Sequence, residues 1–320
     1  MNSKRPAAKA AKRASRSVAK PAVGAAARGK AAKPDKAART ARPANTAPQA
    51  TTAAAPAAQA ATFSLEPIFA AARKLVPAAR HAELREFLAA FYMRMEADEY
   101  PYHAPETWAA IGLDMLEFAR KRKPGTANVR VINPTRARNG WESQYTVLQI
   151  VNDDMPFLVD SVSMALSEMG VGVHVLGHPL VRLERDRAGK LVEVGQGKAE
   201  SLMLLEIDRQ PPEAMERIEQ RIRQTLEEVR VVVADWGLMR DRMQTLADDL
   251  ATRRMPESVS DAARREAQEF LRWAAADHFI LFGYREYRVE RQGGEDVLAP
   301  VEGSGLGLMR GKDRSAPRPV

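Results

Sequence analysis

Residues 145–170 of this 320-residue chain read YTVLQIVNDDMPFLVDSVSMALSEMG and combine a strand, an acidic turn and a helix. The β-branched and aromatic residues at 145–151 predict the strand. After the turn, apolar residues recur every three or four positions as far as Gly170, which predicts a helix. Asp154 or its neighbour can cap that helix, and Pro156 costs no hydrogen bond in a first turn. The stretch therefore predicts a strand–turn–helix unit.

Further strands are predicted on both sides of this unit. They cover 129–132, a long strand at 172–185, a short one at 191–194 after the turn at 187–190, and 201–207. A helix follows from Pro211. The order β-β-α-β-β-α predicts an α+β sandwich, in which helices cover one face of an antiparallel sheet.

Helices are predicted before and after this sandwich. Two of them, around 84–95 and 105–123, precede the first strand, and the second ends in a cationic turn followed by Pro124. From 211, apolar residues recur with a mean spacing near 3.5 as far as Leu250, with weak points at Asp235 and Gly237. This pattern predicts one long helix or two in line, although residues 231–233 also fit a strand. Its apolar seam fits self-association or packing within its own domain.

The last part of the chain predicts the start of a second β-containing domain. An amphipathic helix follows Pro256, a strand is predicted at 278–289, and a return strand at 297–298 follows Gly293 and Gly294. The chain ends soon afterwards, so we expect it to be the front part of a larger protein.

Basic residues are concentrated at the N-terminus. The first 60 residues hold 13 Lys and Arg against one acid, Asp35, a charge of +12, whereas the remainder carries −4. Residues 1–62 are rich in Ala, Lys and Pro and have no aromatic residue, which predicts a disordered tail. The tail is either a solvated extension or a segment attracted non-specifically to polyanions. We expect no specific nucleic-acid binding.

Composition and motifs exclude several kinds of site. The chain has no cysteine, which rules out disulfides and thiolate chemistry, and no apolar run long enough to span a membrane. It contains no HExxH, GxSxG or P-loop motif. His174 and His178 lie about 13 Å apart along a strand, too far to share an ion. We therefore predict no metal site and no catalytic residue in this stretch.

Two segments remain as candidate ligand sites. Gly303–Gly307 is glycine-rich, but Leu308 stands where a dinucleotide fingerprint needs its third glycine, so we interpret it as a flexible turn. The turn at 153–156 is either a helix cap or a binding site for a free amino acid. In the second reading, backbone N–H groups hold the carboxylate and an aspartate holds the ammonium.

Several motifs resemble those of one enzyme family. They are residues 152–162, His178-Pro179, the strand Glu200–Arg209, Phe270–Trp273, Asp277–Phe279, Phe282–Tyr287 and Gly303–Gly307. In this order they resemble the N-terminal region of the large bacterial NAD-specific glutamate dehydrogenases, over roughly residues 75–310.

The resemblance implies an ACT-like, ferredoxin-like regulatory domain ahead of a distant Rossmann-containing catalytic domain. It also implies oxidation of L-glutamate to 2-oxoglutarate and ammonia with NAD bound outside this stretch. By this resemblance, effector-binding residues are expected at Asp153, Asp154, Met155 and Phe157. Phe157 departs from the family's turn, where a glycine commonly follows the proline, and residues 129–132 are expected to supply the fourth ACT strand in a shifted order.

These observations define a domain plan and two hypotheses. The plan is a tail at 1–62, helices at 63–127, an ACT-like domain at 128–235, connecting helices at 236–276 and a truncated β-containing domain at 277–320. The first hypothesis is the non-catalytic regulatory and assembly part of a cytoplasmic, homo-oligomeric NAD-dependent glutamate dehydrogenase with a free amino-acid effector. The alternative is a free-standing amino-acid sensor with a polyanion-binding tail.

Overall fold

The computed structural model describes residues 64–93, 103–311 and 318–319. The tail predicted at 1–62 therefore lies outside the described residues. The described chain mixes helices with antiparallel strands, as the α+β prediction requires.

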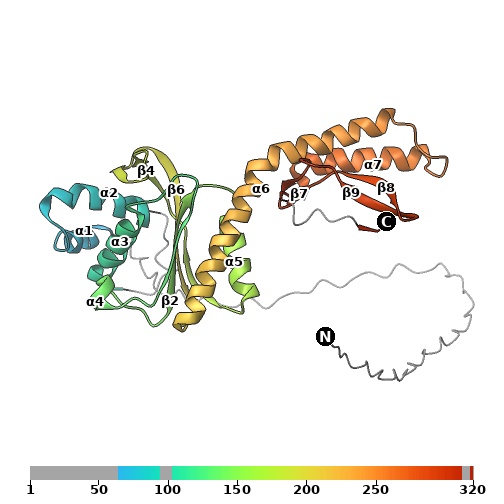
Figure 1. Cartoon of the computed structure of the whole chain (residues 1–320). Coiled ribbons are helices and arrows are strands. Elements are labelled where there is room, and N and C mark those ends of the chain that lie inside the picture. Colours follow the sequence, from blue (N-terminus) through green and yellow to red (C-terminus); the bar gives the residue numbers. More distant parts are fainter. Residues whose placement is uncertain (1–63, 94–102, 312–317, 320) are drawn as a thin grey trace, which may run out of the picture. The chain divides into compact units, whose positions relative to one another are not determined.

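A six-stranded antiparallel sheet forms the centre of the ACT-like domain (Figure 1). Its path is β1-β2-β6-β4-β5, and β3 also pairs with β6. The strands are β1 (Asn128–Ile132), β2 (Thr146–Asp153), β3 (Val173–Gly177), β4 (Leu180–Arg185), β5 (Leu191–Val194) and β6 (Lys198–Ile207). Val129 and Val131 in β1 pair with Ile150 and Leu148 in β2. β1 thus supplies the outer strand beside β2, which confirms the expected shifted order.

The two helices of the predicted β-β-α-β-β-α unit cover one face of this sheet, as predicted, but the helices that precede the unit cover the other face, which was not predicted (Figure 1). Almost every residue of β2 is buried, because its side chains alternate between two cores. One face packs against α1 (Glu66–Ala72), α2 (His81–Tyr92) and α3 (Pro105–Ala119). The opposite face packs against α5 (Leu158–Glu168) and α6 (Pro212–Thr252), and a short α4 (Arg136–Asn139) follows β1.

Two details differ from the sequence predictions. The long strand predicted at 172–185 is divided into β3 and β4 at His178 and Pro179, since proline has no N–H to donate to a neighbouring strand. Both pieces pair with the long β6. More helix precedes β1 than the two helices predicted, because α1 and a 3-10 turn, η1 (Ala78–Arg80), come before α2.

The long helix α6 is one continuous helix of 41 residues. Residues 231–233 lie within it, so the strand alternative is excluded. Ile218, Ile222 and Leu226 of its apolar seam are buried against α5 and the sheet. This half of the seam packs within its own domain.

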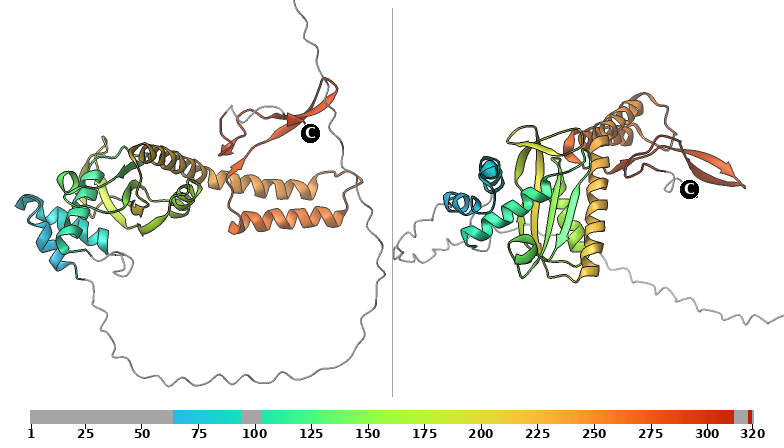
Figure 2. Two further views of the ribbon diagram at one scale, coloured as in Figure 1. Left: turned by 90° about the horizontal axis from the view of Figure 1, so that it is seen from below. Right: turned by 60° about the vertical axis from the view of Figure 1, so that its left-hand side comes forward.

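The last described elements begin with α7 (Asp261–Trp273), which lies alongside α6 (Figure 2). A π-helical turn, η2 (Ala274–His278), follows, and Asp277 in it has a left-handed φ of 60°. The strand predicted from 278 therefore begins later, with β7 (Gly283–Tyr284) and β8 (Tyr287–Gln292). β8 pairs with β9 (Glu295–Pro300), β7 with β10 (Leu306–Gly307), and β9 with β11 (Arg318–Pro319).

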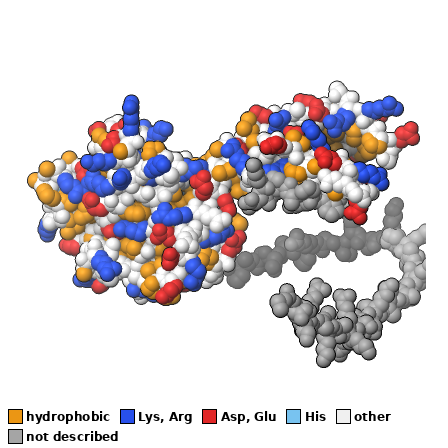
Figure 3. Space-filling model, viewed as in Figure 1, with side chains coloured by type: hydrophobic (Ala, Val, Ile, Leu, Met, Phe, Trp, Pro, Cys, Tyr) orange, Lys and Arg blue, Asp and Glu red, His pale blue; other side chains and the backbone are white. Residues whose placement is uncertain are grey.

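Charged side chains of both signs are interspersed over the face drawn in Figure 3. This agrees with the nearly balanced composition of the chain beyond residue 60. Within the described ranges, no helix is both long enough and apolar enough to cross a membrane.

Candidate functional site

The carboxylate of Asp153, at the end of β2, is held by two arginines. Arg122 Nη2 donates to Asp153 Oδ1 at 2.7 Å, and Arg230 Nη1 on α6 donates to Oδ2 at 2.7 Å. Arg230 Nη2 also donates to Asn152 Oδ1 at 2.6 Å. Partial burial raises the pKa of Asp153, but the two arginine hydrogen bonds outweigh it, so this pKa lies below its ordinary value. Asp153 is therefore ionised, and each of its carboxylate oxygens accepts a hydrogen bond from an arginine.

Arg122 also belongs to a buried charge network. Its Nε donates to Glu200 Oε2 at 2.9 Å, and its Nη1 donates to the Thr126 carbonyl at 2.8 Å. Arg185 binds the same Glu200 carboxylate through two nitrogens, at 2.6 and 2.9 Å. The side chains of Arg122 and Glu200 are each 3% exposed. A buried carboxylate between two buried guanidiniums fixes the geometry of β4, β6 and the Asp153 turn.

The sequence reasoning missed this network. Arg122 belongs to the cationic run that was predicted to end a helix, but α3 ends at Ala119 and Arg122 is buried. Nothing in the pattern of four adjacent cations distinguishes Arg122 from its exposed neighbours. Glu200 lies at the start of a predicted strand, where a buried acid has no periodic signal. The only available signal was the need of each buried charge for a partner of opposite sign.

The four residues predicted to bind an effector have different surroundings. Asp154 is exposed and accepts a hydrogen bond from Ser201 Oγ at 2.9 Å. Met155 is half-buried against the core formed by α5 and α6. Neither aspartate caps α5, because that helix begins at Leu158, its N-cap residue is Phe157, and no side chain caps it. The cap interpretation was therefore wrong.

Phe157 adopts a left-handed backbone conformation with φ of 69°. Glycine adopts this conformation without steric cost, whereas a residue with a Cβ pays about 1–2 kcal/mol. The resemblance leads us to expect a glycine at this position, and a glycine would adopt the left-handed conformation without strain. Here a phenylalanine takes the strained position, and the residue is 37% exposed.

The ring of Phe157 lines a mainly apolar pocket of about 110 Å³ between the start of α5 and α6. Val229 and Val232 on α6 also line it, as do Phe282 and Leu308 from the C-terminal part of the described chain. Ser161 and Glu228 are polar residues of the lining. Glu228 is 37% exposed and accepts a hydrogen bond from Gln224 on Oε1 at 2.9 Å, while its Oε2 lies 3.7 Å from Arg221 Nη1. An apolar cavity beside an uncapped helix start and a carboxylate has the parts needed to bind a small amino acid.

His174 and His278 each contact a hydrogen-bonding partner, whereas the Nε2 atom of His178 is buried without one in the described part of the chain. His174 Nε2 lies 2.8 Å from Asp208 Oδ1, and its ring stacks on Tyr145. Burial lowers the pKa of His178, and the charge of Asp154 only partly opposes this. His278 Nδ1 lies 2.9 Å from the Trp273 carbonyl. Among the described residues, no group of three or more His, Asp or Glu side chains could hold a metal ion.

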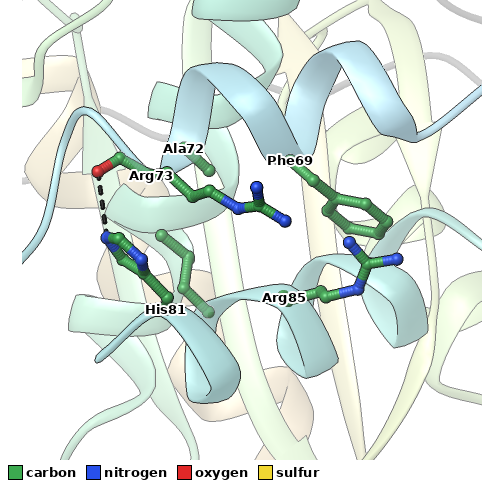
Figure 4. Close-up of a pocket in the computed structure, with 6 residues that line it drawn as sticks. Phe69, Ala72, Arg73, His81 and Arg85 are labelled. Atoms are coloured by element: carbon green, nitrogen blue, oxygen red, sulfur yellow. Dashed lines mark hydrogen bonds between the residues drawn. The ribbon is translucent and has the colours of Figure 1, made fainter. Parts of the chain in front are cut away.

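A second, smaller hollow lies between α1 and α2 (Figure 4). His81 Nε2 lies 3.1 Å from the Arg73 carbonyl and 3.2 Å from that of Val76. The Arg85 guanidinium lies over the Phe69 ring, 4.3 Å from its centroid. The hollow has a volume of about 10 Å³, which is room for no more than one water molecule. These contacts hold the helix pair together and leave no ligand site.

The glycine-rich segment Gly303–Gly307 does not fit a nucleotide phosphate. The Gly307 N–H donates to Asp235 Oδ2 at 2.7 Å, and Arg310 Nε donates to the same atom at 2.6 Å. A buried carboxylate therefore takes the N–H that a phosphate would need, and it would repel a phosphate. β10, at the end of the segment, pairs with β7 in an antiparallel manner. The segment is an anchored turn and not a dinucleotide loop.

Comparisons with known proteins agree with this fold. Residues 87–222, which include the Asp153 turn and α5, match the family model for the ACT1 domain of glutamate dehydrogenase. The chain is 33% identical over 237 residues to an NAD-specific glutamate dehydrogenase of Halomonas elongata, covering 72% of this chain. It is 35% identical over 190 residues to the Pseudomonas aeruginosa enzyme of that name, covering 57% of this chain, and 26% identical over 181 residues to the Mycobacterium tuberculosis one, covering 53%. These matches span only 15%, 12% and 11% of the three relatives' lengths.

Proposed function

Because this chain belongs to the N-terminal region of the NAD-specific glutamate dehydrogenase family, we propose that it is the regulatory and assembly part of such an enzyme. The complete enzyme would oxidise L-glutamate to 2-oxoglutarate and ammonia in the cytoplasm, with NAD bound outside this stretch. The observation that carries the proposal is the ACT1 match over 87–222, which includes the Asp153 turn and Phe157. The other residues that line the Phe157 pocket, apart from Ser161, come later in the chain. A free-standing sensor is not favoured, because the relatives matched are long dehydrogenases.

The regulatory part of the proposal concerns a free amino acid in the Phe157 pocket. The carboxylate would bind the backbone N–H groups at the start of α5, which no side chain caps. The ammonium would bind Glu228, because it lines the pocket and its only ion pair among the described residues is a long one to Arg221, whereas both oxygens of Asp153 are held by arginines at 2.7 Å. The cavity of about 110 Å³ is mainly apolar, so it suits a small apolar side chain. The effector is therefore a small apolar amino acid, such as alanine or valine.

The assembly part concerns the apolar side chains that the described chain leaves in solvent. Phe270, Trp273 and Phe282 are 54%, 47% and 62% exposed. Exposed aromatic side chains that lie close together in sequence are typical of surfaces that bind another protein surface. We expect a homo-oligomer, and sedimentation of the chain with Phe270→Ser should show a weaker self-association than the wild type.

Two experiments test the proposal. Residues 1–320 incubated with glutamate and NAD should form no NADH, and measurable turnover by the chain alone would contradict a non-catalytic role. Calorimetric titration with valine should give one site, weakened about tenfold or more by Glu228→Gln because a charged partner of the ammonium is lost. Glu216→Gln, another exposed glutamate of α6 outside the pocket, is the matched control and should bind as the wild type does. Equal affinity of both variants would remove Glu228 from the site.

A further inference from the structure

A larger and more polar pocket, of about 550 Å³, lies between the C-terminal part of α6 and the segment that links β7 to β8. Arg242, Thr245 and Asp249 line it from α6, and Arg253 lines it from the residue directly after that helix. The three helix residues are three or four residues apart, so they share one face of the helix. The consecutive residues 284–288, which include Tyr284, Glu286 and Arg288, line it from the opposite side. This pocket shares no lining residue with the Phe157 pocket.

The two walls are close enough to interact electrostatically. Tyr284 donates a hydrogen bond from its hydroxyl to Glu286 Oε1 at 2.9 Å. Burial and this glutamate raise the pKa of Tyr284, and the positive charge of Arg242 across the pocket opposes the increase. Arg285 Nη2 donates to the Gly311 carbonyl at 3.0 Å, which fixes the strand side of the pocket. The arginines on the two walls therefore face a common space.

The pocket carries an excess of positive charge. Its lining includes four arginines, Arg242, Arg253, Arg285 and Arg288, and only two acids, Asp249 and Glu286. Within the described part of the chain, Arg242, Arg253 and Arg288 form no ion pair with a carboxylate, whereas Arg122, Arg185 and Arg230 around the Asp153 turn all do. Guanidinium groups bind carboxylates and phosphates through pairs of parallel hydrogen bonds.

We propose that this pocket binds a small multivalent anion that carries carboxylate or phosphate groups. Its volume falls within the range of small-molecule sites, roughly 300–1,000 Å³. Arginines on two opposite walls suit a ligand with at least two anionic groups, one for each wall. The proposal goes beyond the amino-acid site, because it uses different residues and does not depend on an effector at Phe157.

The experiment is calorimetric titration of the 320-residue chain with citrate and, separately, with inorganic tripolyphosphate. These probes represent the carboxylate and phosphate forms of the ligand. We expect one saturable site for at least one probe, with an affinity that falls as salt is raised. Arg242→Gln and Arg288→Gln should each weaken that binding about 10- to 100-fold, because each removes a charged hydrogen bond. Both positions are exposed, so circular dichroism should show an unchanged fold.

The control must separate the pocket from the basic tail, which holds 13 Lys and Arg and attracts polyanions. Arg265→Gln on α7 removes one exposed charge outside the pocket and should leave the affinity unchanged. Binding weakened equally by Arg265→Gln and Arg242→Gln would indicate a general charge effect and overturn the proposal. Absence of saturable binding by both probes would also overturn it, whereas the amino-acid titration would be unaffected by either result.

Discussion

Arg122 Nε lies 2.9 Å from Glu200 Oε2, and this pair is buried between the end of α3 and the middle of the sheet. Through its Nη2, the same arginine holds Asp153 at the end of β2. The turn before α5 is therefore held by buried charges and not by a helix cap. A ligand beside Phe157 would bind to a turn whose backbone is already fixed.

Replacing Arg122 by alanine should destabilise the fold strongly. The variant leaves the Glu200 and Asp153 carboxylates with one arginine fewer each, and breaking a buried ion pair from one side costs about 3–5 kcal/mol. Urea unfolding measures the loss. Lys123→Ala removes the adjacent, exposed cation and should change the free energy of unfolding by no more than about 0.5 kcal/mol. Similar losses for the two variants would refute the buried network.

The backbone strain at Phe157 predicts an unusual order of stability between two variants. Phe157→Ala and Phe157→Gly both remove the ring, but only alanine keeps the cost of a left-handed φ. The glycine variant should therefore be more stable than the alanine variant, by about 1 kcal/mol. Chemical denaturation of the pair gives the difference directly. The opposite order would mean that the turn changes conformation when the ring is removed.

The sequence located this turn but not its partners. The strand, the proline and the apolar period of α5 are local signals, so a single pass along the chain finds them. Arg122 and Arg230 reach Asp153 from positions 31 residues before it and 77 residues after it in the chain. Such pairings depend on the sheet order, which local periodicity does not contain. The same reason explains why Glu200 was missed.

Asp235 should make the stability of the protein depend on acid pH. The Arg310 hydrogen bond, together with that of the Gly307 N–H, keeps the pKa of Asp235 below its ordinary value despite burial. A carboxyl with a lowered folded pKa contributes stability above its unfolded pKa, near ~3.9, and loses it as the pH falls through the folded value. Unfolding measured from pH 6 to pH 2 should show this loss in the wild type, and the difference from Asp235→Asn should shrink over that window. A constant difference would contradict the assignment.

Gly307 should tolerate substitution less well than Gly303. Both have a left-handed φ, 57° and 75° respectively. A Cβ on Gly307 would lie 2.4 Å from the Phe282 carbonyl oxygen, whereas a Cβ on Gly303 meets nothing within 4 Å. Gly303→Ala should cost only the backbone strain of about 1–2 kcal/mol, and Gly307→Ala should cost more. Hydrogen exchange of amides in β7 and β10 measures the difference, and equal protection in the two variants would be inconsistent with the anchored turn.

This anchor also shows what the sequence could predict of the fold. The spacing of apolar residues predicted α6, and within that pattern Asp235 was recognised only as a polar interruption of the apolar seam. The glycine-rich segment stood out only as a turn. In the structure the two features belong together, because the buried carboxylate of Asp235 binds the N–H of Gly307 in the glycine-rich segment. The helix layer on the second face of the sheet was missed for a similar reason, since an almost continuously apolar strand such as β2 does not reveal how many helices cover it.

Thermal unfolding of the 320-residue chain, scanned against the twenty amino acids at millimolar concentration, tests the central claim most directly. A ligand at about 100 times its dissociation constant stabilises a protein by about 2.7 kcal/mol. Small apolar amino acids should raise the melting temperature of the wild type, and Phe157→Ala should reduce that rise because it removes one wall of the pocket. No shift with any amino acid, or a shift unchanged by Phe157→Ala, would contradict an effector site at this turn.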